Sequence, residues 1–231
     1  MAISCGIFSM SGTGKTTSIV INPDGTYNPE DYHGLNPETT IIINGDKKEL
    51  PFKQKEVWIV GKNVFNTSNV DTILKILNGA SESTKIKVVI IDTLNSLMLD
   101  KELLETKKLT YDKWADLAKE IYSLIVDINS LRKDLVVYLM GHVTLYTDVD
   151  GNESKCLITN GKKLEKIKLE SKMPVVLFGK VDRGTQGDNK FFFETQSNRS
   201  TGKTPIGMFE EFQIPNSLAL VDSTIRSYYE L

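Results

Sequence analysis

Short apolar runs recur along the first 142 residues and are separated by segments of mixed polarity. A continuous apolar run is typical of a parallel strand that is buried on both faces of a sheet. We therefore expect strands at residues 2–8, 39–44, 86–91 and 135–140, with a further short strand at 57–60. Segments that keep one apolar face predict helices, and these lie at residues 14–21, 71–79 and 111–133. Strands and helices alternate, which predicts an α/β fold with a mainly parallel sheet flanked by helices.

Beyond residue 142 the pattern changes to strand pairs separated by turn-forming residues. The expected strands lie at residues 145–149, 156–159, 174–181 and 190–195. The first pair flanks Asp150-Gly151, a strong hairpin signal, and the second flanks a turn at 183–189. We expect antiparallel strands that extend an edge of the sheet, followed by a terminal helix near residues 222–229.

The length of 231 residues fits one domain, 1–231, with a core at 1–142 and a β-hairpin and helix extension at 143–231. A net charge of −2 gives no global basic field, so any contact with nucleic acid must be local. Cys5 and Cys156 lack metal-ligand spacing, and neither a signal peptide nor a membrane-length apolar stretch is evident. These features indicate a protein of the reducing cytoplasm without a membrane partner.

A glycine-rich segment, residues 9–17, follows the first strand and precedes the first expected helix. Its final Gly-Lys-Thr matches the P-loop, which binds ATP and Mg²⁺. Loop amides and the helix N-terminus would hold the phosphates, Lys15 would meet the β- and γ-phosphates, and the Thr16 hydroxyl would ligate magnesium. Ser9 replaces the first glycine of the pattern, which narrows the backbone geometry allowed there. The residues expected to bind the nucleotide are Ser11, Gly12, Thr13, Gly14, Lys15, Thr16 and Thr17.

A buried carboxylate is expected at the end of the apolar strand 86–91, where Asp92 follows directly. Its carboxylate would hold the same magnesium through water, although an aspartate that caps a helix would have the same spacing. Thr93 follows, so a second acid does not stand beside Asp92 in the sequence.

These motifs together resemble the phage-encoded P-loop ATPases with a RecA-like core, the group that includes Sak-type single-strand annealing and recombination ATPases. The matching segments are residues 11–17, 40–47, 50–53, 89–93, 159–164, 203–205 and 214–218. The resemblance implies ATP hydrolysis, a homo-oligomeric ring or filament, and single-stranded DNA as a partner. Phage single-strand-binding or recombination proteins would be further partners, in the host cytoplasm.

The resemblance also assigns expected roles to two groups of the core. RecA-like enzymes place the acid that activates water at the end of an inserted strand, and the strand 39–44 separates the loop from Asp92 in the sequence. Asp46 is then the candidate base and Glu49 the reserve, although acids near a turn are often only solvated. His142 follows the strand 135–140 and would contact the γ-phosphate, or would merely cap that strand.

Cations in the second part of the chain complete the expected site. No arginine lies near the motifs, since Arg132 falls inside the helix expected at 111–133. Lys203 and Arg199 would face the γ-phosphate of a neighbouring subunit, where positive charge stabilises the transition state, or would be ordinary exposed loop residues. Four lysines would contact DNA phosphates or form a solvated helical face: Lys162, Lys163, Lys166 and Lys168.

Three other classes of protein share part of this pattern. A small-molecule or nucleotide kinase usually clamps phosphates with several arginines, and the four arginines here are widely separated. A GTPase would carry an Asn-Lys-x-Asp motif, which the sequence lacks. A nucleotide-gated interaction protein with little hydrolysis would carry the same phosphate loop.

Overall fold

The computed structural model describes residues 1–53, 56–104, 112–147, 151–160, 162–184 and 189–231. Their main element is an eight-stranded sheet with the order β10-β9-β8-β1-β5-β4-β2-β3. Its strands are β1 (Ile3–Phe8), β2 (Thr40–Asn44), β3 (Val64–Phe65), β4 (Val88–Asp92), β5 (Val136–Gly141), β8 (Val175–Asp182), β9 (Lys190–Glu194) and β10 (Gln213–Pro215). Six neighbouring strands from β3 to β8 are parallel, and β9 and β10 add an antiparallel edge. The predicted α/β class with a mainly parallel sheet is confirmed.

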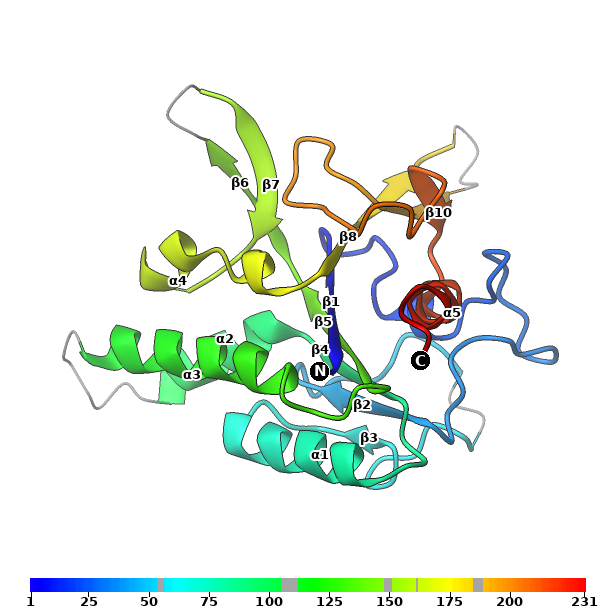
Figure 1. Ribbon diagram of the computed structural model, residues 1–231, viewed down its shortest axis with the longest axis horizontal. Coiled ribbons are helices and arrows are strands. Elements are labelled where there is room, and N and C mark those ends of the chain that lie inside the picture. The colour runs from blue at the N-terminus through cyan, green and yellow to red at the C-terminus, as the bar shows by residue number, and fades with distance from the viewer. Residues whose placement is uncertain (54–55, 105–111, 148–150, 161, 185–188) are drawn as a thin grey trace.

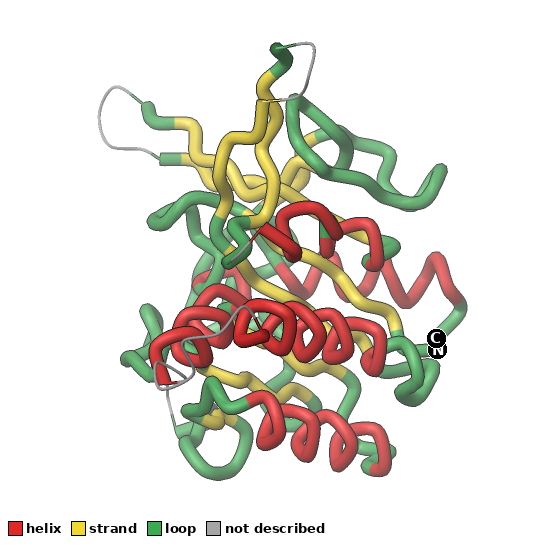
Figure 2. The backbone as a smooth tube through the Cα atoms, turned by 90° about the vertical axis from the view of Figure 1, so that its left-hand side faces the viewer, coloured by secondary structure: helices red, strands yellow, loops and turns green. Residues whose placement is uncertain are grey.

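The central strands are buried on both faces because their side chains alternate between two apolar layers. In β2, for example, Ile41 and Ile43 pack into one layer and Ile42 into the other. Helices α1 (Val70–Glu82), α2 (Leu94–Leu104) and α3 (Asp112–Ile128) cover the first face, as Figures 1 and 2 show. The second face is covered by α5 (Leu218–Tyr229) and by the long excursion that follows β1. Among the described helices, none has the length and apolar character that crossing a membrane requires.

The prediction of a helix at residues 14–21 is wrong in extent, because only a single 3₁₀ turn, η1 (Thr17–Ile19), forms there. Hydroxyl side chains satisfy nearby carbonyls instead: Thr17 Oγ1 donates to Gly14 O at 3.0 Å, and Ser18 Oγ donates to Lys15 O at 2.5 Å. Such local bonds compete with helix formation, and Pro23 then disfavours a helical residue before it.

Two other helix boundaries differ from the prediction. Helix α3 ends at Ile128 rather than at 133, because residues 129–131 form the tighter bonds of a turn, such as Asn129 N to Val126 O at 3.0 Å. Helix α5 begins at Leu218 because Ser217 caps it, accepting a bond from Leu220 N at 3.3 Å. Residue 111, Asp150 of the first expected turn and residues 185–188 of the second lie outside the described part of the chain.

The strand expected at residues 57–60 is also wrong. Val57, Ile59 and Val60 are exposed, and a lone bridge joins Val60 to Val64. The parallel partner of β2 on that side is β3 instead. Residues 57–60 are apolar, but only Trp58 is buried, and the segment forms a bend around it instead of a strand.

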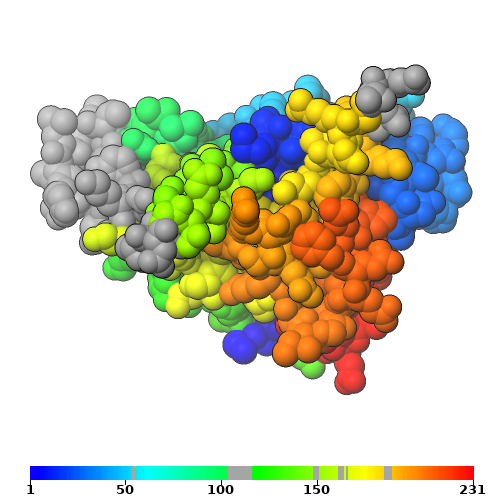
Figure 3. All heavy atoms as spheres, turned by 90° about the horizontal axis from the view of Figure 1, so that it is seen from above, coloured from blue at the N-terminus to red at the C-terminus, as the bar shows by residue number. Residues whose placement is uncertain are grey.

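The first hairpin does not extend the sheet edge, contrary to the prediction. Strands β6 (Val143–Thr147) and β7 (Glu153–Leu157) form a separate two-stranded sheet. Strand β6 continues directly from β5, which lies between β1 and β4, so no free edge is available beside it. The hairpin therefore projects beyond the main sheet (Figure 1), and Figure 3 shows it from above beside the loop that follows β9. Strands β8 and β9 do form the expected antiparallel pair, while β8 is itself parallel to β1.

Candidate active site

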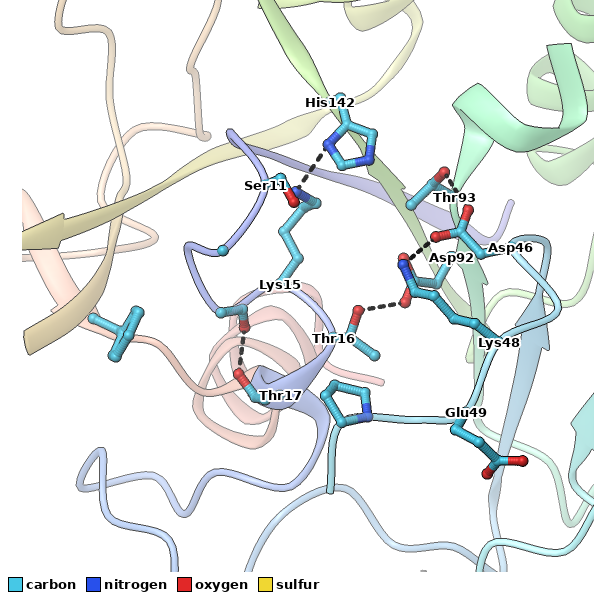
Figure 4. Close-up of a pocket in the computed structure, with 14 residues that line it drawn as sticks. Ser11, Lys15, Thr16, Thr17, Asp46, Lys48, Glu49, Asp92, Thr93 and His142 are labelled. Atoms are coloured by element: carbon cyan, nitrogen blue, oxygen red, sulfur yellow. Dashed lines mark hydrogen bonds and ion pairs between the residues drawn. The ribbon is translucent and has the colours of Figure 1, made fainter. Parts of the chain in front are cut away.

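The carboxyl ends of β1, β2, β4 and β5 meet at one edge of the sheet, where ligands of open α/β sheets usually bind. A cavity of about 320 Å³ opens there, and Figure 4 shows how its side chains converge. Its lining comprises Ser11, Gly12, Gly14, Lys15, Thr16, Thr17, Asp46, Lys48, Glu49, Pro51, Asp92, Thr93, His142 and Phe191. The structure therefore brings together the glycine-rich loop and the strand-end residues that the sequence singled out.

The loop owes its shape to two glycines with left-handed backbone angles, Gly12 with φ 77° and Gly14 with φ 84°. Lys15 is buried beneath it, and its Nζ donates to Ser9 O at 2.9 Å and to Met10 O at 3.1 Å. Burial lowers the pKa of Lys15 to about 8, and the nearby Asp92 carboxylate only partly offsets that effect. An anion bound in the loop would therefore stabilise the charged form of this lysine.

Ser9, which departs from the P-loop pattern, is accommodated by its partner strand. The Ser9 Oγ accepts bonds from Thr13 Oγ1 at 2.5 Å and from Lys15 Nζ at 3.2 Å. Gly179 of β8 lies opposite, where an added Cβ would be 3.0 Å from Ser9 Cβ. Ser9 also has no positive φ, so its position does not demand glycine. Ser9 therefore has room for its side chain because the residue opposite it on β8, Gly179, has none.

The loop ends in a 3₁₀ turn of three residues, η1, instead of the expected helix. A helix macrodipole needs several aligned peptide groups, so little of it is available here. An anion bound at this loop would therefore be held by the loop's own amide groups and by Lys15.

A hydroxyl and a carboxylate meet directly below the loop. Thr16 Oγ1 donates to Asp92 Oδ2 at 2.6 Å. Asp92 is buried, and burial raises its pKa above the ordinary value. Both groups offer the hard oxygen ligands that Mg²⁺ prefers, and this ion commonly takes one or two carboxylates together with substrate phosphates. Within the described residues no group of three or more His, Cys, Asp or Glu could hold a metal unaided. The pair therefore fits a magnesium ion that takes further ligands from the oxygens of a bound phosphate.

Asp46 also reaches the cavity. Its carboxylate accepts bonds from Lys48 Nζ and Ser96 Oγ, with Thr93 Oγ1 at 3.4 Å. Burial would raise the pKa of Asp46, but the bonds from Lys48 and Ser96 outweigh it and keep the pKa below the ordinary value. Asp46 is thus ionised at neutral pH, as a base must be, whereas Glu49 lines the same cavity but is exposed.

The strand that carries Asp46 is not the one inserted between the loop and Asp92 in space. Strand β5 lies between β1 and β4, and β2 lies on the far side of β4. The strand that separates the loop from Asp92 in the sequence is therefore not the strand that separates them in the sheet. Asp46 still reaches the cavity because the turn after β2 folds back, with Gly45 N bonded to Asp92 O at 2.7 Å.

His142 ends the interposed strand β5 and faces Lys15. Its Nδ1 lies 3.5 Å from Lys15 Nζ, and its backbone N donates to Asn95 Oδ1 at 2.7 Å. Burial and then the positive charge of Lys15 lower the pKa of His142, so the ring is neutral at pH 7. The ammonium of Lys15 can only donate, so the tautomer that accepts this contact at Nδ1 carries its ring proton on Nε2.

The cations predicted from the second part of the chain lie elsewhere. Lys203 is exposed, with its Nζ 3.4 Å from Ser171 O, and its backbone pairs with Val176 near the start of β8. Arg199 is also exposed, and its carbonyl accepts a bond from Lys155 N of β7. Neither contributes to the described lining of the cavity, so a role at the γ-phosphate would need a neighbouring copy and stays a prediction.

The four lysines proposed for DNA lie near α4 (Lys162–Ile167), below the hairpin. Lys166 is exposed, and Lys168 Nζ lies 3.7 Å from the centre of the Tyr146 ring. The side chains of Lys162 and Lys163 lie outside the described part of the structure.

Arg132 is not within a helix, contrary to the prediction. It follows the end of α3, and its guanidinium bonds to Asp134 and to carbonyls such as Ser81 O at 3.2 Å. Since Asp134 precedes β5, Arg132 lies at the opposite edge of the sheet from the cavity.

Several residues of the site were not singled out by the sequence. Lys48 and Phe191 line the cavity, and Asn216 donates to Thr13 O at 3.1 Å behind the loop. Lys48 left a signal, since it follows Asp46 by two positions in a polar segment, and Asn216 falls in the matching segment 214–218, although neither was given a role. Phe191 comes from a distant segment and could be placed only by the fold.

A parallel sheet with a glycine-rich loop after its first strand is an arrangement that this chain shares with P-loop α/β folds. No protein-family model and no curated protein matches the sequence, so the resemblance to Sak-type ATPases rests on its short motifs alone. Among solved structures, a KaiC-like protein from the hyperthermophilic archaeon Pyrococcus horikoshii is similar, with 15% identity and a TM-score of 0.43. That match covers 83% of this chain and 76% of the other. At such a score the likeness carries no argument about activity, which must come from the site.

Proposed function

We propose that the chain is a magnesium-dependent ATPase. The observation that supports this most is the convergence in one cavity of Lys15, the Thr16–Asp92 pair and the ionised Asp46. A phosphate-binding lysine, a pair of magnesium ligands and a base are the groups that phosphoryl transfer to water requires.

Each group has a distinct task in this proposal. Lys15 exchanges its bonds with the loop carbonyls for the β- and γ-phosphate oxygens, while amides of the loop bind the same phosphates. Thr16 and Asp92 would hold Mg²⁺, which neutralises charge on the β- and γ-phosphates when bound. Asp46 accepts a proton from the attacking water as the bond between the γ-phosphorus and the bridging oxygen breaks. His142 offers its Nε2 proton to a γ-phosphate oxygen.

An aromatic side chain favours a nucleotide over a simple polyphosphate. Phe191 is 41% exposed and lines the cavity. An added Cβ on Gly14 would be 3.3 Å from its ring, which places that ring against the loop. We infer that Phe191 contacts the base or ribose, because an exposed aromatic face is suited to stacking.

Nucleotide binding and hydrolysis can be tested separately. Titration of the purified chain with Mg-ATP should show binding that weakens when magnesium is chelated, and phosphate release should require the metal. The matched comparison is inorganic triphosphate, which lacks the base and should bind more weakly. Binding without turnover would favour a nucleotide-gated interaction protein, and phosphate transfer to a nucleoside would favour a kinase. Absence of binding would contradict the proposal.

We further propose that single-stranded DNA is the partner, as the resemblance implies. The projecting hairpin supports this, because Leu145 is 60% and Tyr146 37% exposed, and the ammonium of Lys168 lies against the Tyr146 ring. An exposed aromatic ring next to a lysine is typical of surfaces that stack bases and bind phosphates without sequence preference. A homo-oligomeric ring or filament, phage recombination proteins as partners and a role in phage recombination or replication belong to the same proposal.

The DNA proposal has its own measurement. Binding of a fluorescent oligonucleotide should weaken steeply as salt rises, because each phosphate contact releases counterions. Lys162→Ala with Lys163→Ala should flatten that dependence. Equal binding by the wild type and the double variant would show that DNA binds at another surface. No binding by the wild type at low salt would exclude DNA as the partner.

A further inference from the structure

A second cation of the chain itself reaches the cavity. Lys48 lines it, and its ammonium forms an ion pair with Asp46. Figure 4 shows the Lys48 side chain extending toward Asp46 above the contact between Thr16 and Asp92. The charge of Lys48 also acts on Lys15, whose pKa it helps to lower. In the described lining of the cavity, Lys15 and Lys48 are the two cationic side chains.

The turn after β2 holds Lys48 at this place. Asn44 Nδ2 donates to Lys48 O at 2.7 Å and to Asn66 Oδ1 at 2.9 Å. Lys47 takes a left-handed conformation with φ 55°, and its own ammonium turns away to pair with Asp100 at 2.8 Å. Two adjacent lysines therefore point to different sites, and only Lys48 faces the cavity.

The pair between Lys48 and Asp46 is suited to being exchanged. The Lys48 side chain is 63% exposed and that of Asp46 18%. An ammonium as exposed as that of Lys48 gains little from such a pair, because water screens its charge. A γ-phosphate carries more negative charge than one carboxylate, so it would compete for the Lys48 ammonium. Asp46 would keep its bond from Ser96 and would stay in place when Lys48 leaves.

We propose that Lys48 is a catalytic cation supplied by the same chain, which moves from Asp46 to the γ-phosphate when ATP binds and so releases Asp46 to act as the base. In the step itself, a bond forms between the water oxygen and the γ-phosphorus, the bond to the ADP oxygen breaks, and the water proton passes to Asp46. Lys48 neutralises charge on the transferred group. Before ATP binds, the same pair keeps the base occupied. The inference rests on the proposed ATPase activity.

The test compares Lys48→Ala with Lys47→Ala, which removes a neighbouring lysine that points away from the cavity. Lys48→Ala should lower single-turnover phosphate release by about 100-fold or more, as loss of one group that stabilises transition-state charge typically does. Its affinity for ADP should stay within about threefold of the wild type, while its affinity for ADP with aluminium fluoride, which imitates the transferred phosphoryl group, should fall in parallel with the rate. Lys48→Arg should recover part of the rate, and Lys47→Ala should match the wild type.

The outcomes separate this inference from the function on which it rests. A wild-type chain that neither binds nor hydrolyses ATP would refute the proposed function, and the inference would fall with it. An active wild type with an equally active Lys48→Ala would overturn the inference and leave the function standing. If Lys203→Ala loses activity while Lys48→Ala keeps it, the cation comes from a neighbouring subunit instead. Loss of ADP binding equal to the loss of rate would also overturn it, because Lys48 would then serve binding alone.

Discussion

The contact between Ser9 and Gly179 allows a sharp test of how the loop is held. In Gly179→Ala, the new Cβ would lie 3.0 Å from Ser9 Cβ and 3.1 Å from Ser9 Oγ. Carbon atoms in good contact are about 3.5–4.0 Å apart, so one side must yield. Ser9 resists, since its amide donates to Gly141 O at 3.1 Å and its hydroxyl accepts bonds from Thr13 and Lys15. The substitution should therefore displace the loop.

Two opposing effects set the magnitude. Overpacking costs about 1–3 kcal/mol, whereas alanine in place of glycine inside a strand gains roughly 0.5–1 kcal/mol. We expect Gly179→Ala to lower the free energy of unfolding by about 1 kcal/mol and to weaken ATP binding as the loop shifts. Urea denaturation measures the first effect, and nucleotide titration measures the second.

A second substitution isolates the contact. Ser9→Gly removes both atoms that the new methyl group would meet, so Ser9→Gly with Gly179→Ala should be more stable than the two single effects predict. Gly79→Ala is the control, because an added Cβ there has no atom within 4 Å. That variant should gain stability, as alanine does in an exposed helix. If Gly179→Ala is as stable as the wild type and shows no coupling to Ser9, the reasoning is refuted.

The remaining predictions concern the metal, the hairpin and the far edge of the sheet. Asp92→Asn and Thr16→Ala should each reduce magnesium-dependent turnover far more than ATP affinity, and full activity of Asp92→Asn would assign the metal to another acid. Tyr146→Ala should weaken oligonucleotide binding by about tenfold or more, since stacking contributes about 1–3 kcal/mol per base; equal titration curves would exclude the hairpin. The pKa of Asp134 is lowered to about 2 by its bonds from Lys87 and Arg132, which outweigh the opposing effect of burial. Its stabilisation is therefore complete above the unfolded pKa of about 4 and is lost as pH falls toward 2. Asp134→Asn should be less stable than the wild type by about 1 kcal/mol at neutral pH, with a difference that shrinks on acidification in urea denaturation.

The parts of the site that could be predicted from sequence are those fixed by local spacing. The loop around Lys15 follows a strand directly, and Asp92 ends an apolar run, so both had to lie at the carboxyl edge of a parallel sheet. Asp46 was found through the resemblance, although its strand, β2, lies beyond β4 in the sheet and not between β1 and β4. Its place in the cavity depends on a turn that folds back toward β4, which a pattern of apolar residues does not specify.

Features that depend on the neighbours of a strand could not be predicted. The hairpin β6–β7 projects because β5 is an inner strand, and that follows from the sheet order rather than from the hairpin sequence. The compensation of Ser9 by Gly179 joins segments far apart in the chain. Lys48 and Lys47 are alike in sequence, and the left-handed turn at Lys47 decides which of them faces the cavity.

The central claim is that this cavity hydrolyses Mg-ATP, and phosphate release by the wild type beside Lys15→Ala tests it most directly. Burial already disfavours the charge of Lys15. Removing this side chain in Lys15→Ala should therefore leave the unfolding temperature within a few degrees of that of the wild type. We predict magnesium-dependent phosphate release by the wild type and none above background by the folded variant. Equal turnover by the two proteins, or a wild type that neither binds nor hydrolyses ATP, would contradict the account.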